Sequence, residues 1–451
     1  MACPAGTAGI GGTIMNARER RTTLIALGML LPNFLGFLVF VAGPVVFSFI
    51  MAFTNWDLTL HNRFSTDQVM FVGFDNFKAL FGGAQWRYFS KYFYNTVYLM
   101  MAIPVGIALS LVAALLLNSE IKPLSQRTGK KERLIVPLIT IIGAGAMYML
   151  GAHPGGIFLF LLTGGLVLLT LVVKQTAFRT MFYLPHFTSG VAIYILWKAM
   201  YRPETGPINN ILQPILNSIA SLVSSTPAVL WQSIGWLFVL AMAGFFLWSV
   251  VTLVIKFKDE DIGVIGLIFS ILGIAIFFTL IGSLGYVTGN LPKWVAEQGG
   301  LFAPSWLVSV QWAKPALLIM AVFFAMGSNN MLLYLAALNN VPTHLYDAAA
   351  IDGANAWQRF WNVTWPQLAP TTFFIVIMAT IYGLQGGFEQ ARVMTEGGPA
   401  GSTTTLSYYL YLTGFDDFRL GMASAIAWTM FALIFTMTMV NWRYGNRMVN
   451  D

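Results

Sequence analysis

Long runs of apolar residues recur along this chain, and they limit its fold more than any other feature. The first run, residues 22–50, contains no charged side chain. Only 10% of the chain is charged, whereas a soluble domain carries about 25% charged residues. An α-helix crosses the hydrocarbon core of a bilayer with about 20 apolar residues, and backbone groups in lipid must be paired within such helices. The sequence therefore predicts an all-α polytopic membrane protein.

Ten runs satisfy this length criterion. We expect spans at about 24–50, 95–117, 134–150, 156–173, 181–201, 235–256, 262–286, 312–336, 371–388 and 420–441. The third and fourth are short and are joined by a Pro154-Gly155 turn, so they form a hairpin whose loss would leave the sidedness of later segments unchanged. The first run is too long for the apolar core of a secretory signal, which predicts an uncleaved span.

Basic residues indicate the orientation. With a cytoplasmic amino terminus, 15 of the 25 Lys and Arg residues fall in inside segments, although the outside segments are longer. Lys and Arg accumulate in cytoplasmic loops. Both termini are therefore expected in the cytoplasm, together with the polar segment 339–370. The formal net charge of +7 reflects this topology and does not predict binding to nucleic acid.

The segment 339–370 has the turn chemistry of two short helices. Pro342 stops the preceding span, and the hydroxyl of Thr343 can cap a helix that follows. Gly353 suits the left-handed residue that ends this helix. Asn355 and Gln358 have the spacing of a capping box for a second helix.

The second helix is rich in aromatic residues. It carries Trp357, Phe360 and Trp361 at helical spacing. We expect it to end at Pro366 and Pro370, which cannot continue a helix. Two interpretations fit this helix pair. It is either a docking element for a soluble partner or an interfacial pair that lies among lipid headgroups.

The order of residues in this segment resembles the cytoplasmic EAA loop of ABC importer permeases. In that loop a Glu-Ala-Ala start is followed by Asp-Gly-Ala, a Phe and a Pro, and here Asp347 replaces the Glu. Other blocks resemble segments of sugar-importer permeases and keep the order of that family. They are residues 71–77, 178–185, 206–209, 305–307, 395–403 and 421–425.

By this resemblance the chain is identified as a member of the maltose-permease-like branch. The implied fold is the six-helix core of a type I ABC importer with two inserted transmembrane hairpins. The implied parts are a cytoplasmic tail at 1–21, core at 22–119, an inserted hairpin at 120–176, core at 177–213, an inserted loop and hairpin at 214–303, core at 304–442 that includes the docking loop 339–370, and a cytoplasmic tail at 443–451.

The resemblance also implies partners in a bacterial inner membrane. They are a second homologous permease, two ATP-binding subunits and an extracytoplasmic solute-binding protein. In this family the first loop helix sits in a groove of the ATP-binding subunit. Docking is therefore expected of Asp347, Ala348, Ala349, Asp352, Gly353, Ala354, Phe360 and Pro366.

The chain itself is not expected to be an enzyme. It has no Walker A pattern, since the Lys130 region lacks the earlier Gly and the following hydroxyl. ATP and Mg²⁺ are thus expected in partner subunits. The four His residues are scattered and Cys3 is the single cysteine, so we expect no metal or cofactor in this chain.

Polar uncharged residues flank the docking loop inside the neighbouring spans. They are Asn329, Asn330, Tyr334, Tyr382 and Gln385. Amides and aromatic rings suit a neutral, hydroxyl-rich solute such as a carbohydrate or polyol, although such residues also hydrogen-bond between helices.

Other classes of function make different demands. An ion-coupled carrier would need ionisable groups inside the membrane, and an enzyme acting on lipid or glycan would need an ionisable cluster at one membrane face. The outside segments 54–94, 202–232 and 389–419 are either connecting loops or contacts for a binding protein.

Overall fold

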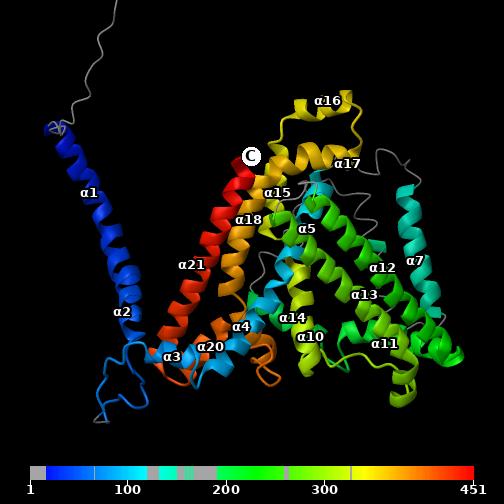
Figure 1. Cartoon of the computed structure of the whole chain (residues 1–451), viewed down its shortest axis with the longest axis horizontal. Coiled ribbons are helices and arrows are strands. Elements are labelled where there is room, and N and C mark those ends of the chain that lie inside the picture. The colour runs from blue at the N-terminus through cyan, green and yellow to red at the C-terminus, as the bar shows by residue number, and fades with distance from the viewer. Residues whose placement is uncertain are drawn as a thin grey trace, which may run out of the picture. The chain divides into compact units, whose positions relative to one another are not determined.

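The computed structural model of this chain describes residues 17–64, 67–118, 132–149, 190–258, 264–325 and 328–450, with a few helical positions between 157 and 165 (Figure 1). The described residues form helices and no strand, and their β pairing is limited to an isolated bridge between Thr54 and Phe71. The all-α expectation is therefore confirmed. The expected span at 156–173 lies largely outside the described residues, and the motif at 178–185 lies wholly outside them.

Six helical stretches among the described residues are long and apolar enough to cross a membrane. They are Leu24–Met51, Trp86–Asn118, Ala228–Leu253, Val310–Asn339, Ala356–Gln385 and Leu420–Arg443. Two further apolar helices are shorter, Pro137–Met149 and Gly190–Met200. The arrangement of ten spans, the two inserted hairpins and the positions of the termini stay predictions.

The chain divides into two compact units. The first comprises Met1–Met100, Thr372–Phe388 and Thr404–Asp451. Its helical segments are α1 (Ala17–Phe37), η1 (Leu38–Ala42), α2 (Gly43–Met51), α3 (Asp75–Phe81), α4 (Trp86–Met100), α20 (Leu406–Tyr411), η5 (Leu412–Asp416) and α21 (Leu420–Asn450).

The second unit comprises Met101–Thr371 and Glu389–Thr403. Its helical segments are α5 (Ala102–Asn118), α7 (Glu132–Met149), α10 (Gly190–Met200), α11 (Pro207–Ser225), α12 (Ala228–Lys258), α13 (Val264–Gln298), α14 (Val310–Ala325), α15 (Asn329–Asn339), α16 (Thr343–Ile351), α17 (Ala356–Arg359), η3 (Phe360–Thr364) and η4 (Ala391–Thr395). Residues of α18 (Trp365–Gln385) and α19 (Phe388–Gln390) belong to both units.

An apolar cluster holds the first unit together where α2, α3, α4, α20 and α21 meet. Ala52, Leu80 and Ile426 are fully buried in it. The end of α2 is fixed by Asn76 of α3, whose Nδ2 donates to the carbonyls of Ala52 and Thr54 at 2.9 and 2.8 Å. This asparagine belongs to the block at 71–77, so that block has a structural task in joining two elements.

Small residues let α5 pack closely against α14 and α15 in the second unit. A Cβ added at Gly106 would lie 2.5 Å from the Cβ of Ala325. The hydroxyl of Ser110, one turn further along α5, donates to the carbonyl of Ala325 at 2.6 Å. This packing holds α15 against α5, and the loop that follows begins at the end of α15.

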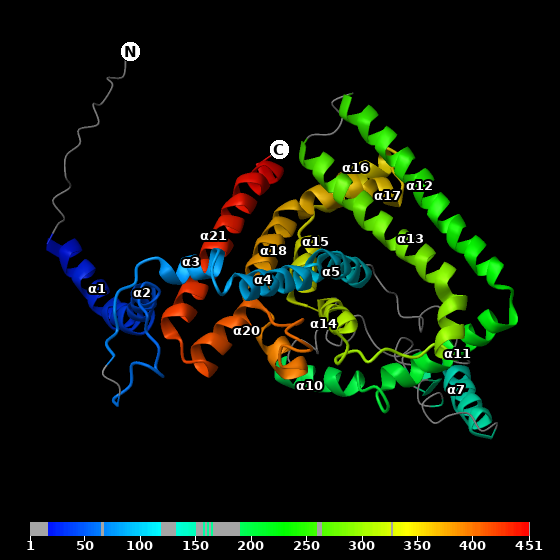
Figure 2. The same ribbon diagram turned by 60° about the horizontal axis from the view of Figure 1, so that its bottom comes forward.

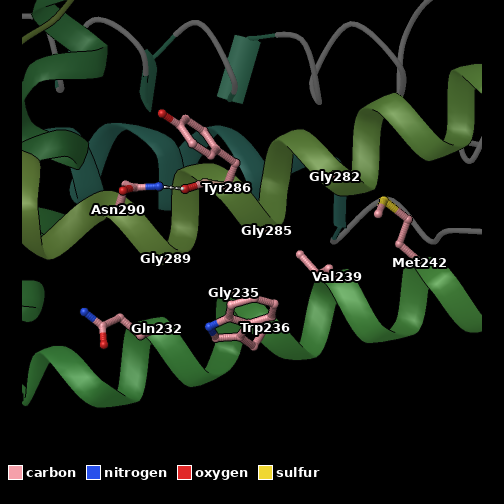
Figure 3. A pocket seen from close by; sticks show the side chains of 10 residues that line it. All are labelled: Gln232, Gly235, Trp236, Val239, Met242, Gly282, Gly285, Tyr286, Gly289 and Asn290. Carbon is pink, nitrogen blue, oxygen red and sulfur yellow. Dashed lines mark hydrogen bonds between the residues drawn. The ribbon is translucent and has the colours of Figure 1, made fainter.

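Glycines also set the contact between α12 and α13, which lie side by side in Figures 1 and 2. Gly235 faces Gly285 and Gly289 (Figure 3). A Cβ added at Gly235 would lie 2.8 Å from the carbonyl oxygen of Gly285, so the two backbones approach too closely for a side chain. A groove of about 500 Å³ lies along this contact and is lined in part by Trp236 and Tyr286.

Candidate functional site

The loop between α15 and α18 begins with the short helix α16. Pro342 precedes it in an extended conformation, with φ −62° and ψ 129°. We expected Thr343 to cap this helix, and that expectation is wrong. Thr343 is the first helical residue, and the cap position is taken by Pro342, which has no side-chain hydrogen bond to the helix. Proline fixes its own φ, but its side chain offers no acceptor to the first-turn N–H groups of α16.

The end of α16 is closed as the sequence predicted. Gly353 has a φ of +74°, the left-handed conformation that favours glycine. The amide of Ala354 donates to the carbonyl of Ala349 at 2.9 Å, and the amide of Gly353 donates to that of Ala350 at 3.2 Å. These two bonds form a Schellman motif. They satisfy the last carbonyls of α16 and reverse the chain toward α17.

The predicted capping box of the second helix is confirmed. The amide of Gln358 donates to Asn355 Oδ1 at 2.9 Å, and the amide of Asn355 donates to Gln358 Oε1 at 2.9 Å. The helix does not end at Pro366 and Pro370, which corrects our expectation. It runs from α17 through the wider turn η3 into α18, as far as Gln385. Pro366 lies one residue after the amide of Trp365, which donates to the carbonyl of Phe360 in the wider turn η3.

A pair of hydroxyls joins the two helices of the loop. Tyr346 of α16 and Thr364 of η3 lie 3.0 Å apart, oxygen to oxygen. Thr364 is buried. The spacing of these residues along the chain gave no sign of the contact, because it arises only once the Schellman turn has folded α16 back beside η3. Figures 1 and 2 show α16 and α17 close together at the end of α15.

No residue of α16 is buried. Its surface combines small, acidic and apolar groups, and Ile351 is 87% exposed. Among the docking residues expected from sequence, Asp347, Ala348, Asp352, Gly353 and Pro366 are exposed, and Ala349, Ala354 and Phe360 are half-buried. Six of the eight expected docking residues, at positions 347–349 and 352–354, therefore lie on α16 or in the turn that ends it, and α16 is accessible along its length. Phe360 and Pro366 lie on the continuing helix.

The expected path residues do not form one described site. Asn329, Asn330 and Tyr334 lie on α15 in the second unit, whereas Tyr382 and Gln385 lie on the part of α18 that belongs to the first. Asn329, Tyr382 and Gln385 are exposed, Asn330 is half-buried and Tyr334 is fully buried. Within the part of the chain that the structure describes, no three His, Cys, Asp or Glu side chains gather as metal ligands.

Comparison with known families and proteins gives a consistent result. The family model "Binding-protein-dependent transport system inner membrane component" matches residues 206–448. The sn-glycerol-3-phosphate transport system permease protein UgpA of Brucella abortus is 37% identical over 134 residues, which are 30% of this chain and 46% of that protein. The chain thus spans just under half the length of these curated relatives.

Two longer matches cover nearly the whole chain. The probable ABC transporter permease protein YesP of Bacillus subtilis is 23% identical over 425 residues, which are 93% of this chain and 90% of that protein. A chain of a bacterial alginate ABC transporter, solved in complex with an alginate pentasaccharide-bound periplasmic protein, superposes with a TM-score of 0.56. That superposition covers 96% of this chain and 97% of the other at 18% identity, so it shows a shared fold.

Proposed function

Because this chain belongs to the family of binding-protein-dependent transport system inner membrane components, we propose that it is a transmembrane permease subunit of an ATP-driven ABC importer. It forms the translocation path together with a second, homologous permease. Two ATP-binding subunits drive it, and a solute-binding protein outside the membrane delivers the solute. The chain spans a bacterial inner membrane several times, with both termini in the cytoplasm.

The observation that carries this proposal is the geometry of α16. The helix is short, open along its length and closed by a Schellman turn at Gly353. Exposed alanines such as Ala348 let another protein approach the backbone closely, and Asp347 beside them can accept a hydrogen bond from a basic group. A helix of this kind fits a groove on an ATP-binding subunit and moves as a lever when that groove closes.

The proposed solute is a carbohydrate or a related polyol. Support comes from the relatives, which include a permease for sn-glycerol-3-phosphate and a transporter of alginate. Neutral amides and rings suit hydroxyl-rich solutes, and we propose that Asn329, Asn330, Tyr334, Tyr382 and Gln385 contribute to the path. Because Tyr334 is buried in this conformation, its contribution requires a rearrangement of α15 during transport.

The docking role is tested by filling the small-residue surface of α16. We expect Ala348→Trp to abolish co-purification of the ATP-binding subunits from the native membrane, because an indole at this exposed position blocks entry into a groove. Ala84→Trp is the matched control, since Ala84 is also an exposed alanine and lies in the segment proposed to face outside. Full recovery of the ATP-binding subunits with Ala348→Trp would overturn the proposal.

A further inference from the structure

A row of aromatic rings lies on the second helix of the docking loop, and Phe360 is the one member of it that the sequence predicted to take part in docking. Trp357, Trp361 and Trp365 follow one another at intervals of four residues, with ring centroids 5.6 and 5.8 Å apart. Phe360 packs against Trp361 at 5.2 Å. These four residues form one continuous surface, here called the aromatic stripe. Trp357 is 70% exposed and Trp361 is 44% exposed.

The indole N–H groups of the stripe have no acceptor within the described chain. Neither Trp357, Trp361 nor Trp365 donates a hydrogen bond to any described residue. The buried Trp306 differs from them in this respect. It donates to Asn209 Oδ1 at 2.7 Å. Large rings whose polar N–H groups remain free are suited to a boundary between apolar and polar surroundings, where the ring and the N–H are both satisfied.

The length of the helix indicates where the stripe lies. The stretch Ala356–Gln385 contains 30 residues, and at 1.5 Å per residue it is about 45 Å long. The hydrocarbon core takes up about 30 Å, so about ten residues lie beyond it. The polar end is the amino end, with Gln358, Arg359 and Asn362, whereas 373–384 is almost wholly apolar. The excess therefore falls on 356–365, the segment that carries the stripe.

We propose that the aromatic stripe is an interfacial anchor that binds glycerophospholipid headgroups at the membrane face next to the docking loop. The rings insert at the level of the ester groups, and the indole N–H groups donate to ester and phosphate oxygens. Tryptophan is enriched at this depth for that reason. The inference rests on the proposed function only for the assignment of this face to the cytoplasmic leaflet.

The two loop helices then have different surroundings. The acidic residues Asp347 and Asp352 belong to α16 and its exposed end, and an anionic leaflet repels them, so α16 faces water and the ATP-binding subunit. The following helix is held in the membrane surface. The turn at Gly353 separates the two parts, and the contact between Tyr346 and Thr364 passes motion of α16 to the anchored helix and so to α18.

The anchor is tested by measuring depth in the membrane. Cys3→Ser removes the single cysteine, and a nitroxide is then attached after Trp361→Cys or, as the matched control on α16, after Ile351→Cys. Each variant is reconstituted in vesicles of phosphatidylethanolamine and phosphatidylglycerol, with and without ATP-binding subunits. We expect the ratio of collision rates with oxygen to those with a water-soluble nickel complex to be several-fold higher at position 361 than at position 351.

Two results would overturn the anchor. One is an equal ratio at the two positions, which would place the stripe in water. The other is loss of access to both reagents at position 361 only when the ATP-binding subunits are present, which would make the stripe a protein contact. Co-purification of the ATP-binding subunits, measured on the same variants, reports separately on the proposed function. Failure of the anchor and failure of docking are therefore distinguishable.

Discussion

Gly353 determines how the docking loop turns, because the chain reverses at this one residue. Its φ of +74° lies in the region where a side chain is strained. A Cβ added at this position meets no atom within 4 Å. Any effect of a substitution must therefore come from the backbone conformation and not from a clash, which makes the position a clean probe of the turn.

We predict that Gly353→Ala weakens binding of the ATP-binding subunit. The left-handed conformation costs an L-residue about 1–2 kcal/mol, which corresponds to a five- to thirtyfold rise in the dissociation constant of the subunit for the chain in nanodiscs. Asn tolerates this conformation better than Ala, so Gly353→Asn should bind more tightly than Gly353→Ala. Unchanged binding with Gly353→Ala would show that the turn is not required, and equal losses for both variants would show that the left-handed conformation does not set the loss.

The sequence predicted the local chemistry of the loop well where neighbouring residues decide it. The capping box of Asn355 and Gln358 and the left-handed Gly353 depend on residues within one turn, and both are confirmed. Thr343 was misjudged because Pro342 occupies the cap position. The contact between Tyr346 and Thr364 joins residues 18 positions apart, so no local pattern indicates it.

At the scale of elements, prolines mark helix ends less reliably than their chemistry suggests. Pro366 and Pro370 both lie within α18. The wider turn η3, Phe360–Thr364, directly precedes α18, and such turns change the direction and spacing of a helix without ending it. Nothing in the sequence indicated η3. Because η3 does not end the helix, the segment that carries the aromatic stripe continues directly into α18.

The close contact of α12 and α13 gives a prediction at the same scale. Gly235→Val places a side chain against the backbone of α13 near Gly285, and overpacking of this kind costs about 1–3 kcal/mol. We expect the variant to have a lower midpoint of thermal unfolding in detergent. Gly244→Val, on the same helix, is the control, because a Cβ at Gly244 meets nothing within 4 Å. A midpoint unchanged by Gly235→Val would refute the close contact.

For the whole molecule, hydropathy predicted a polytopic membrane protein, but it did not determine the number of membrane spans. Apolar runs recur because backbone N–H and C=O groups in lipid must form hydrogen bonds within their own helix. Six helical stretches of this kind are described. The count of ten spans also includes the runs 134–150, 156–173, 181–201 and 262–286, which are not among these six stretches and are only partly described. Length and hydropathy do not decide whether these cross.

The path residues show a second limit at this scale. The polar residues of α15 and α18 flank the docking loop in sequence, yet they belong to different units. Contacts between residues that lie far apart in the sequence do not follow from a local pattern. The turn at Gly353 and the capping box at Asn355 depend on neighbouring residues, so they could be predicted.

The proposed function requires that α16 and α17 face the cytoplasm, where an ATP-binding subunit reaches them. It is tested most directly by labelling single cysteines, introduced as His344→Cys or Gln358→Cys in the Cys3→Ser chain, with a membrane-impermeant maleimide. Ala84→Cys serves as the outside control. We predict that in sealed cells only the cysteine at position 84 reacts, and that positions 344 and 358 react after permeabilisation. Labelling of position 344 or 358 in sealed cells would contradict the account.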